Sequence, residues 1–487
     1  MSSNQTEIQP MTTIEPAAAK AAPQSDIIEN VTFEELEVGQ TASLTREVTQ
    51  QDIELFATVS GDVNPAHLDP EYADASMFHG VIAHGMLSGS LFSTILGTLL
   101  PGPGTIYLGQ DLRFRRPVKP GDVVTATVTV REKVEDKKRV VLDCRCVNQD
   151  GKDLILGQAQ VLAPTEKVHR PRPALPEVRM IRHDACARLL DMCSSLPPVP
   201  TAVVHPCDLD SLQGAMLAAE NGLIVPHLVG PAARIRAIAG EHGIDLSACV
   251  LVDVEHSHAA AAKGVAMARA GEVSAVMKGS LHTDELMAEV VRRDGGLRTA
   301  RRVSHAYVMS VPTYHKTLIV TDAAINIAPD LAAKADIVRN AIDLARILGV
   351  DVPKVAILSA VETVTPKIQS TLDAAALCKM ADRRQITGGV LDGPLAFDNA
   401  ISRVAARTKG IASDVAGDPD ILLAPDLEAG NMLAKQLSFL ASADAAGIVL
   451  GCRVPVVLTS RADSVQTRLA SCAVMALVAG AARAARA

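Results

Sequence analysis

The hydrophobic pattern changes at about residue 165 and divides the chain into two regions. In the first region, 31–165, a short helix over 51–59 and a long apolar segment over 81–100 come before the strands. The alternating or β-branched segments that predict strands are 112–117, 122–132, 139–147 and 154–162. One long buried helix, followed by strands that short turns connect, predicts an α+β domain with a largely antiparallel sheet.

Short apolar strands alternate with Ala-rich helices from about residue 183 onward. The predicted strands are 202–204, 223–225, 250–254, 275–278, 318–321, 355–359, 421–424 and 456–459. This alternation is typical of a parallel sheet with helices on both faces. Because residues 183–487 are many for one such sheet, we expect a two-lobed α/β domain with mainly parallel sheets and a cleft between the lobes.

Two segments fit neither pattern. Residues 1–30 are polar and rich in Ala and Pro, without the basic start and apolar core of a signal peptide, so they predict a disordered leader. Residues 166–182 contain several prolines and charges, which predicts a linker. We therefore expect two folded domains, at 31–165 and 183–487.

Composition narrows the possible functions. The chain has 47 basic and 55 acidic residues, and a formal net charge of −8 argues against a general nucleic-acid or membrane-surface partner. Nine scattered cysteines without a C-x-x-C pair give no disulfide framework, and a cytoplasmic location is the simplest interpretation. Segment 81–100 is long enough to span a membrane, but its histidine, serines, threonines and glycines favour a buried helix.

Two proton-carrying side chains, Asp62 and His67, lie five residues apart around Asn64 and Pro65. The proline ends the preceding helix and fixes a turn, so both groups are expected on one rigid loop. A carboxylate and an imidazole can hold one water between them and exchange acid and base roles. By itself, however, an Asp/His pair at this spacing is more often a turn with surface groups than a catalytic pair.

The flanking strings DVNPAHLDPEYA, HGVIAHGML and GQDLRFRRPVKPGD extend this motif over 35–165. With them the region resembles the MaoC-like, R-specific enoyl-CoA hydratases of the hot-dog fold, in which a sheet wraps the 81–100 helix. The resemblance implies that Asp62 and His67 form the hydration dyad. It also implies that Asn64 orients the dyad, that His84 contacts substrate, that the Gly85 N–H stabilises the thioester oxygen, and that no metal is needed.

Polar side chains follow several of the predicted strands of the second region, at the edge where open parallel sheets bind ligands. They are Lys278, Ser280, Thr283, Arg298, Asp322, Asn326, Ser460 and Arg461. A P-loop pattern, G-x-x-x-x-G-K-[ST], does not occur in the sequence. On spacing alone, Ser460-Arg461 is the start of a helix with a surface arginine.

With these strings, residues 183–487 resemble the phosphate acetyl/butyryltransferase family, most closely its butyryltransferase branch. The resemblance implies two lobes, with Ser460 and Arg461 holding phosphate and the thioester carbonyl and the other polar residues binding substrate. Thr467 stands where acetyltransferases carry an aspartate that is proposed as the base for the coenzyme A thiol. Lys278 stands where they tend to have a small residue. The base therefore remains unidentified.

Together these features predict a bifunctional enzyme without a bound cofactor, whose substrates are coenzyme A thioesters and phosphate. The first domain would hydrate short-chain trans-2-enoyl-CoA to (R)-3-hydroxyacyl-CoA, and the second would transfer an acetyl or butyryl group reversibly between coenzyme A and phosphate. As an alternative, only one module is active and the other is an acyl-CoA-binding or oligomerisation scaffold. Both resemblances imply a homo-oligomer.

Overall fold

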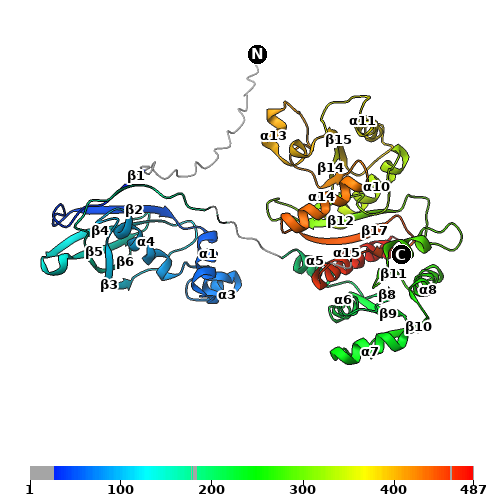
Figure 1. Cartoon of the computed structure of the whole chain (residues 1–487), viewed down its shortest axis with the longest axis horizontal. Coiled ribbons are helices and arrows are strands. Elements are labelled where there is room, and N and C mark those ends of the chain that lie inside the picture. The colour runs from blue at the N-terminus through cyan, green and yellow to red at the C-terminus, as the bar shows by residue number, and fades with distance from the viewer. Residues whose placement is uncertain (1–26, 177, 179–183, 461–462, 486–487) are drawn as a thin grey trace, which may run out of the picture. The chain divides into compact units, whose positions relative to one another are not determined.

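The computed structural model describes residues 27–176, 178, 184–460 and 463–485. Their contacts form two compact units that divide between residues 180 and 181. Figure 1 shows the first unit in blue to teal and the second in green to red. Most of the predicted leader and five residues of the predicted linker lie outside the described residues.

The first unit is built on a five-stranded antiparallel sheet with the strand order β2-β4-β5-β6-β3. Its strands are β2 (Thr41–Glu47), β3 (Ile106–Phe114), β4 (Val123–Val134), β5 (Arg139–Val147) and β6 (Asp153–Leu162). Four of them match the predicted strands. The sequence missed β2, an edge strand with polar, largely exposed residues and little hydrophobic contrast between its faces.

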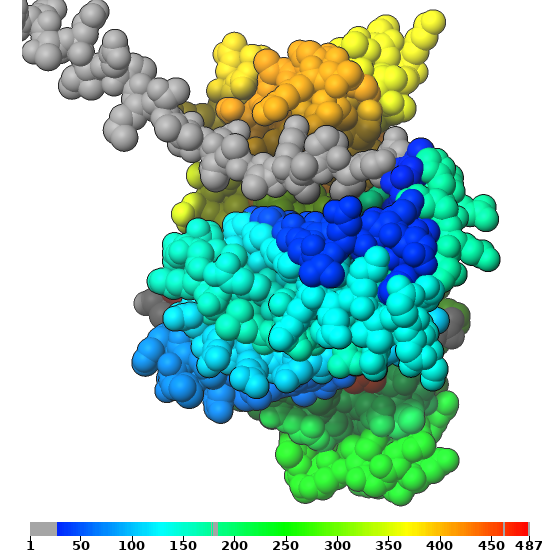
Figure 2. All heavy atoms as spheres, turned by 90° about the vertical axis from the view of Figure 1, so that its left-hand side faces the viewer, coloured from blue at the N-terminus to red at the C-terminus, as the bar shows by residue number. Residues whose placement is uncertain are grey.

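A single long helix, α4 (Gly85–Thr98), lies against this sheet (Figure 1) and forms the core with it. Phe92 and Ile95 of α4 are fully buried, as are Val124, Ala126 and Val128 on the alternating inner face of β4. The predicted hot-dog arrangement is confirmed. In Figure 2, cyan atoms of the sheet lie between dark-blue atoms of the first described residues and lighter blue atoms of the short helices that follow α1.

Three short helices precede α4 and carry the residues of the predicted motif. They are α1 (Gln50–Ser60), α2 (Pro65–Leu68) and α3 (Pro70–Ala75). Helix α4 begins at Gly85 rather than at 81, because His84 has a ψ of 135°, which is extended rather than helical and makes it the N-cap residue. Strands β1 (Ile27–Glu29) and β7 (His169–Pro171) pair with each other, within segments that the sequence assigned to the leader and the linker. Three residues are too few to give a pattern.

The second unit contains one eleven-stranded sheet with the order β10-β9-β8-β11-β18-β17-β12-β13-β16-β14-β15. Its strands are β8 (Val199–Val204), β9 (Ile224–Gly230), β10 (Val250–Asp253), β11 (Ala275–Lys278), β12 (Ser304–Ser310), β13 (Leu318–Thr321), β14 (Lys354–Leu358), β15 (Val390–Leu395), β16 (Ile421–Leu423), β17 (Asp444–Leu450) and β18 (Val456–Val457). Pairing is antiparallel in β18–β17, β17–β12 and β12–β13 and parallel in the other pairs. The predicted two-lobed, mainly parallel α/β fold is confirmed, with one continuous sheet passing through both lobes.

Helices cover both faces of this sheet in an unequal way. They are α5 (Ala185–Cys193), α6 (Leu209–Glu220), α7 (Ala232–His242), α8 (Ser257–Ala270), α9 (Thr283–Val290), α10 (Leu331–Ile347), α11 (Gln369–Asp382), α12 (Phe397–Ile401), α13 (Arg403–Thr408), α14 (Leu427–Leu440) and α15 (Val465–Ala484). One face has a single core with α6, α7, α10, α11 and α15. The other face has two separate cores, one under α8 and α9 and one under α12 to α14. The residues between these two cores are where the lobes face each other.

Helix α15 is the one helix among the described residues that is long and apolar enough to cross a membrane by length and composition. Of its most apolar stretch, 61% is buried inside the second unit. Such burial is typical of the core helix of a soluble domain, so the length of α15 is weak evidence for a membrane span.

A buried ion pair joins α10 to α11: Lys334 Nζ lies 2.6 Å from the Asp373 carboxylate, and both side chains are almost fully buried. We predict that Lys334→Met lowers the free energy of unfolding by about 3–5 kcal/mol, because the buried Asp373 carboxylate loses its cationic partner and is left with the neutral Gln369 side-chain amide. Urea unfolding followed by circular dichroism measures this change. The control is Lys379→Met, whose pair with Asp382 is exposed and should matter little. Equal losses in both variants would contradict the prediction.

Candidate active sites

The loop between α1 and α2 carries Asp62 and is shaped by local hydrogen bonds. Gly61 ends α1 with a left-handed φ of 76°. The Asp62 carboxylate then accepts from the Asn64 N–H at 3.2 Å, and the Asn64 side chain caps α2 by accepting from the Ala66 N–H at 3.0 Å. The predicted rigid turn is therefore present, with Asp62 exposed and Asn64 engaged in shaping the loop.

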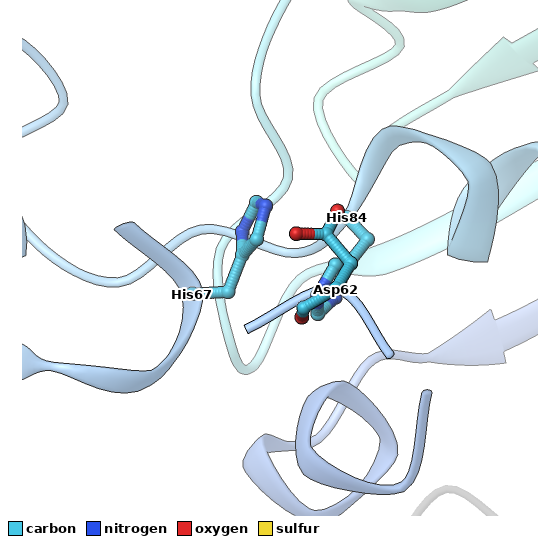
Figure 3. A group of neighbouring side chains, drawn as sticks. All are labelled: Asp62, His67 and His84. Carbon is cyan, nitrogen blue, oxygen red and sulfur yellow. The ribbon is translucent and has the colours of Figure 1, made fainter. Parts of the chain in front are cut away.

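His67, on α2, is held in one tautomer. Its Nδ1 lies 2.8 Å from the main-chain oxygen of Ile82. Because a carbonyl oxygen only accepts, Nδ1 carries the hydrogen and Nε2 of the neutral ring is left as a proton acceptor. Figure 3 shows the Asp62 carboxylate beside this ring. A carboxylate oxygen of Asp62 and one nitrogen each of His67 and His84 lie within 4.8 Å of one another.

Gly85 is the first residue of α4, so its N–H has no acceptor within the helix. A Cβ atom at this position would lie 3.0 Å from Cε1 of Phe114 on β3. Glycine therefore lets β3 approach the start of the helix closely. The Gly85 N–H, which lacks an acceptor in the helix, is the group that the sequence predicted as the donor to the thioester oxygen. Phe114 was missed by the sequence reasoning because its role depends on this tertiary contact.

Asp62, His67 and His84 are also a donor set that could hold a metal ion. One contact disfavours that use. The two rings lie one over the other, with centroids 3.8 Å apart and a tilt of 35°, instead of spreading around a common point. The close approach of the Asp62 carboxylate and the His67 ring also suits an acid–base pair that holds a water between its members.

In the second unit, the loop between β18 and α15 carries the Ser460-Arg461 pair. Arg461 lies outside the described residues. The Ser460 N–H donates to the Asp463 carboxylate at 2.6 Å. From α15, the buried Arg468 guanidinium donates to Thr459 Oγ1 at 3.0 Å and to the Ser460 carbonyl at 3.1 Å. Thr459 and Ser460 are thus held by two charged side chains.

Lys278, at the end of β11, reaches the same loop. Its buried Nζ lies 3.4 Å from the main-chain oxygens of Thr459 and Gly279. Burial raises the pKa of Asp463, against the opposing charges of Arg468, Lys278 and Lys435 of α14. Since β11 contributes to the core under α8 and α9, and α14 to the core under α12 to α14, the charges that act on Asp463 come from elements of both cores.

Ser280 and Thr283 follow β11 toward α9. The Ser280 N–H donates to the His205 carbonyl at 2.8 Å, and its own carbonyl oxygen is 2.8 Å from His205 Nδ1. Against the desolvation that its burial causes, hydrogen bonds from the Ser211 and Ser280 side chains and the charge of Arg468 hold the pKa of Asp208 below its usual value. Thr283 is the exposed first residue of α9. The structure therefore brings Lys278, Ser280 and Ser460 into one neighbourhood.

Asp322, Asn326 and Arg298, the other residues predicted to bind substrate, are bonded to residues outside the loop between β18 and α15. Asp322 and Asn326 are both buried, and the Asp322 carboxylate accepts from the Asn326 side chain at 2.5 Å. Asn326 also donates to the Val303 carbonyl and accepts from Arg302 Nε. These bonds join the loop after β13 to the residues before β12. Arg298 is exposed and forms a backbone bridge to Cys452. Contact of these three residues with substrate remains a prediction.

Asp463 and Arg468 are the main residues that the sequence did not assign to this site. Arg468 stands on the apolar side of a core helix, and Gly214 of α6 makes room for it, since a Cβ there would lie 2.8 Å from its Cδ. Thr467 instead lines a cavity of about 600 Å³ between α5, β12 and α15. A charged residue at an apolar position was the available signal for Arg468.

Comparison with known proteins fits these two sites. Residues 33–147 match the family model "MaoC like domain", and residues 256–476 match "Phosphate acetyl/butaryl transferase". The chain is 65% identical to a phosphate acetyltransferase from Rhizobium meliloti over 299 residues, which are 61% of this chain and 95% of that protein.

Two solved structures align with the separate units. A branched-chain phosphotransacylase from Enterococcus faecalis V583 has 29% identity and a TM-score of 0.51, over 57% of this chain and 99% of its own. The R-hydratase PhaJ1 from Pseudomonas aeruginosa has 49% identity and a TM-score of 0.31, over 32% of this chain and 99% of its own. With the acetyltransferase matched over nearly its whole length, the chain belongs to the phosphate acetyl/butyryl transferase family and carries a MaoC-like domain before that module.

Proposed function

We propose that the chain is a bifunctional acyl-CoA enzyme. Its MaoC-like unit hydrates short-chain trans-2-enoyl-CoA to (R)-3-hydroxyacyl-CoA, and its second unit transfers an acyl group reversibly between coenzyme A and phosphate. The observation that carries the hydratase half is the placement of His67, whose Nδ1 is bonded to the Ile82 carbonyl oxygen while one ring nitrogen lies within 4.8 Å of an Asp62 carboxylate oxygen. Family membership carries the transferase half.

Hydration requires that a water oxygen bond to Cβ and that a proton bond to Cα. A water between His67 Nε2 and the Asp62 carboxylate loses a proton to one of these groups as its oxygen attacks Cβ, and the dyad returns a proton to Cα. The elements of one water are added, and the enzyme ends in its starting protonation state. Negative charge that develops on the thioester oxygen is stabilised by the Gly85 N–H at the start of α4.

We predict that Asp62→Asn lowers kcat for crotonyl-CoA hydration by about 10²–10⁴-fold, because the amide keeps the shape but cannot exchange a proton. The loss of the conjugated thioester absorbance measures the rate. Asp69→Asn is the matched control: Asp69 caps α3 nearby, and Asn caps a helix equally well. Hydration at the wild-type rate in Asp62→Asn would refute the assigned dyad.

In the transferase unit, a phosphate oxygen attacks the thioester carbonyl and the coenzyme A sulfur leaves. A C–O bond replaces the C–S bond. The attacking phosphate hydroxyl releases one proton, which restores a proton-transfer group of the enzyme, and the leaving sulfur takes up one proton from that group. Lys278, Ser460 and Arg461 are the proposed groups for the phosphate and the carbonyl oxygen. Asp463 is the carboxyl group bonded to this loop, and its raised pKa suits a group that gives a proton to the leaving thiolate and takes it back in reverse.

We predict that Asp463→Asn lowers kcat of acyl transfer by about 10²–10⁴-fold while the loop stays capped, because the amide oxygen still accepts from the Ser460 N–H. In the direction of acyl-CoA synthesis, Asp463 must be deprotonated to accept the thiol proton. Wild-type activity therefore rises as the pH increases through the raised pKa of Asp463, and the pH–rate profile of the variant lacks this rise.

Thiol release from acetyl-CoA or butyryl-CoA, with and without phosphate, measures the forward reaction. Asp426→Asn is the control, since Asp426 is also a carboxylate cap, at the start of α14. Release that does not depend on phosphate would indicate a thioesterase and overturn the assignment. Full activity in Asp463→Asn would exclude Asp463 as the proton-transfer group.

The acyl group is best assigned as acetyl. Lys278 and Thr467 favoured the butyryltransferase pattern in the sequence, but a relative with 65% identity over nearly its whole length is named a phosphate acetyltransferase. We therefore infer that these two substitutions do not mark the butyryl reaction. An acyl-CoA chain-length panel with both activities tests the preference.

Thr467 favours one alternative, in which the second unit binds acyl-CoA without turning it over. Its hydroxyl pairs with Ser464 and cannot replace a carboxylate as a base. Coenzyme A binding without phosphate-dependent turnover would support a scaffold. Turnover that Arg461→Ala abolishes would support the enzyme.

A further inference from the structure

His84 occupies an enclosed position directly before α4. Its side chain is buried, with 2% of the residue exposed. The His67 ring stacks on it with centroids 3.8 Å apart and a tilt of 35°, and the Phe56 ring lies 5.1 Å away. Figure 3 shows the His84 ring close to the main chain of Asp62, with the Asp62 carboxylate on the side of His67. A substrate thioester has little access to a ring so enclosed.

The hydrogen bonding of His84 fixes its tautomer. Nε2 lies 3.0 Å from the main-chain oxygen of Asp62, and because that oxygen only accepts, Nε2 carries the hydrogen. Nδ1 is buried and has no hydrogen-bond partner among the described residues. The one N–H donor of the neutral ring is therefore used in a hydrogen bond to the backbone of the loop that carries Asp62.

We propose that His84 is a positioning residue that holds both members of the hydration dyad, rather than a residue that contacts substrate. This inference rests on the proposed hydratase function. The Nε2–H bond fixes the main chain of Asp62, and the stacked ring fixes the plane of His67. The other contact that orients His67 is its Nδ1 bond to Ile82. That bond still allows the His67 ring to rotate about it, and the neighbouring His84 ring limits this rotation.

The loop that His84 holds has few other anchors. The Asp62 N–H is bonded to the side chain of Ser60, at the end of α1, and its carboxylate to the Asn64 N–H, so both bonds reach only two residues along the chain. The neighbouring Val63 is 71% exposed. The bond from His84 reaches across 22 residues to the start of α4, and the next residue is Gly85. His84 thus sets the distance between the acid–base pair and the N–H proposed for the thioester oxygen.

Three variants separate the two contacts. His84→Phe keeps a ring for stacking and loses the donor, His84→Gln keeps an amide donor near the place of Nε2 and loses the ring, and His84→Ala loses both. We expect kcat for crotonyl-CoA to fall on the order of 100-fold in His84→Ala, because displacement of about 1 Å costs that much. The kcat values of His84→Phe and His84→Gln should lie between those of His84→Ala and the wild type, and KM should change little in all three variants.

His79→Asn is the control, since His79 is an exposed histidine of the same unit with a positive φ that asparagine tolerates. A rise in KM with unchanged kcat would show that His84 binds substrate and would overturn the proposal. Equal losses in the Phe, Gln and Ala variants would also overturn it, because neither contact would then act separately.

The ring tautomers provide a test that does not depend on activity. In ¹⁵N-detected imidazole spectra of the full chain at pH 8, we expect the Nε2–H form for His84 and the Nδ1–H form for His67. The His84 signals are identified as those that disappear in His84→Gln. An Nδ1–H tautomer at His84 would refute the proposed bond even if hydration is normal. If the wild type does not hydrate crotonyl-CoA while His84 shows the Nε2–H form, the hydratase function fails and the position of His84 stands.

Discussion

The antiparallel pairing of β17 and β12 is the constraint on which the second unit depends. These two strands join a parallel block that ends with β18 to another that begins with β13, and their register extends over seven residue pairs. Strand direction therefore reverses between the two blocks. The core under α8 and α9 contains residues of the first block, and the core under α12 to α14 contains residues of the second. The Ser460 loop leaves β18 next to this reversal, within reach of charges on elements of both cores.

Both sites place reactive groups on loops and hold them with buried, hydrogen-bonded side chains. In the first unit the holding group is the His84 imidazole, which donates to the main chain of Asp62, and in the second it is the Arg468 guanidinium, which donates to Thr459 and Ser460. Loops leave the reacting atoms accessible to large coenzyme A thioesters, while the bonds limit the freedom that would weaken catalysis. In each unit, a residue that the sequence marked as part of the chemistry is supported by one from a helix start or a core helix.

The sequence predicted the elements whose own residues determine them. Strands β5 and β11 have the predicted bounds, because their runs of apolar residues end at polar turns. Strands β12 and β17 were missed although they are central, since SHAYVMS and DAAGIVL show neither alternation nor a β-branched run. Their strand form is imposed by neighbours on both sides. Likewise, Asp62 and His67 belong to one local motif and were predictable, whereas Asp463 gains its environment from Lys278 and Lys435, which are far away in sequence.

The two imidazoles of the first unit both bind main-chain oxygens, those of Ile82 and Asp62. A carbonyl oxygen is the same whatever side chain its residue carries. Position 82 can therefore change among apolar residues during evolution without changing how His67 is oriented, whereas a replacement of His67 must supply a new donor. In a family alignment, the Ile82 acceptor would leave no conserved column, and the Asp62 column would be conserved for its carboxylate rather than for the main-chain oxygen that His84 binds.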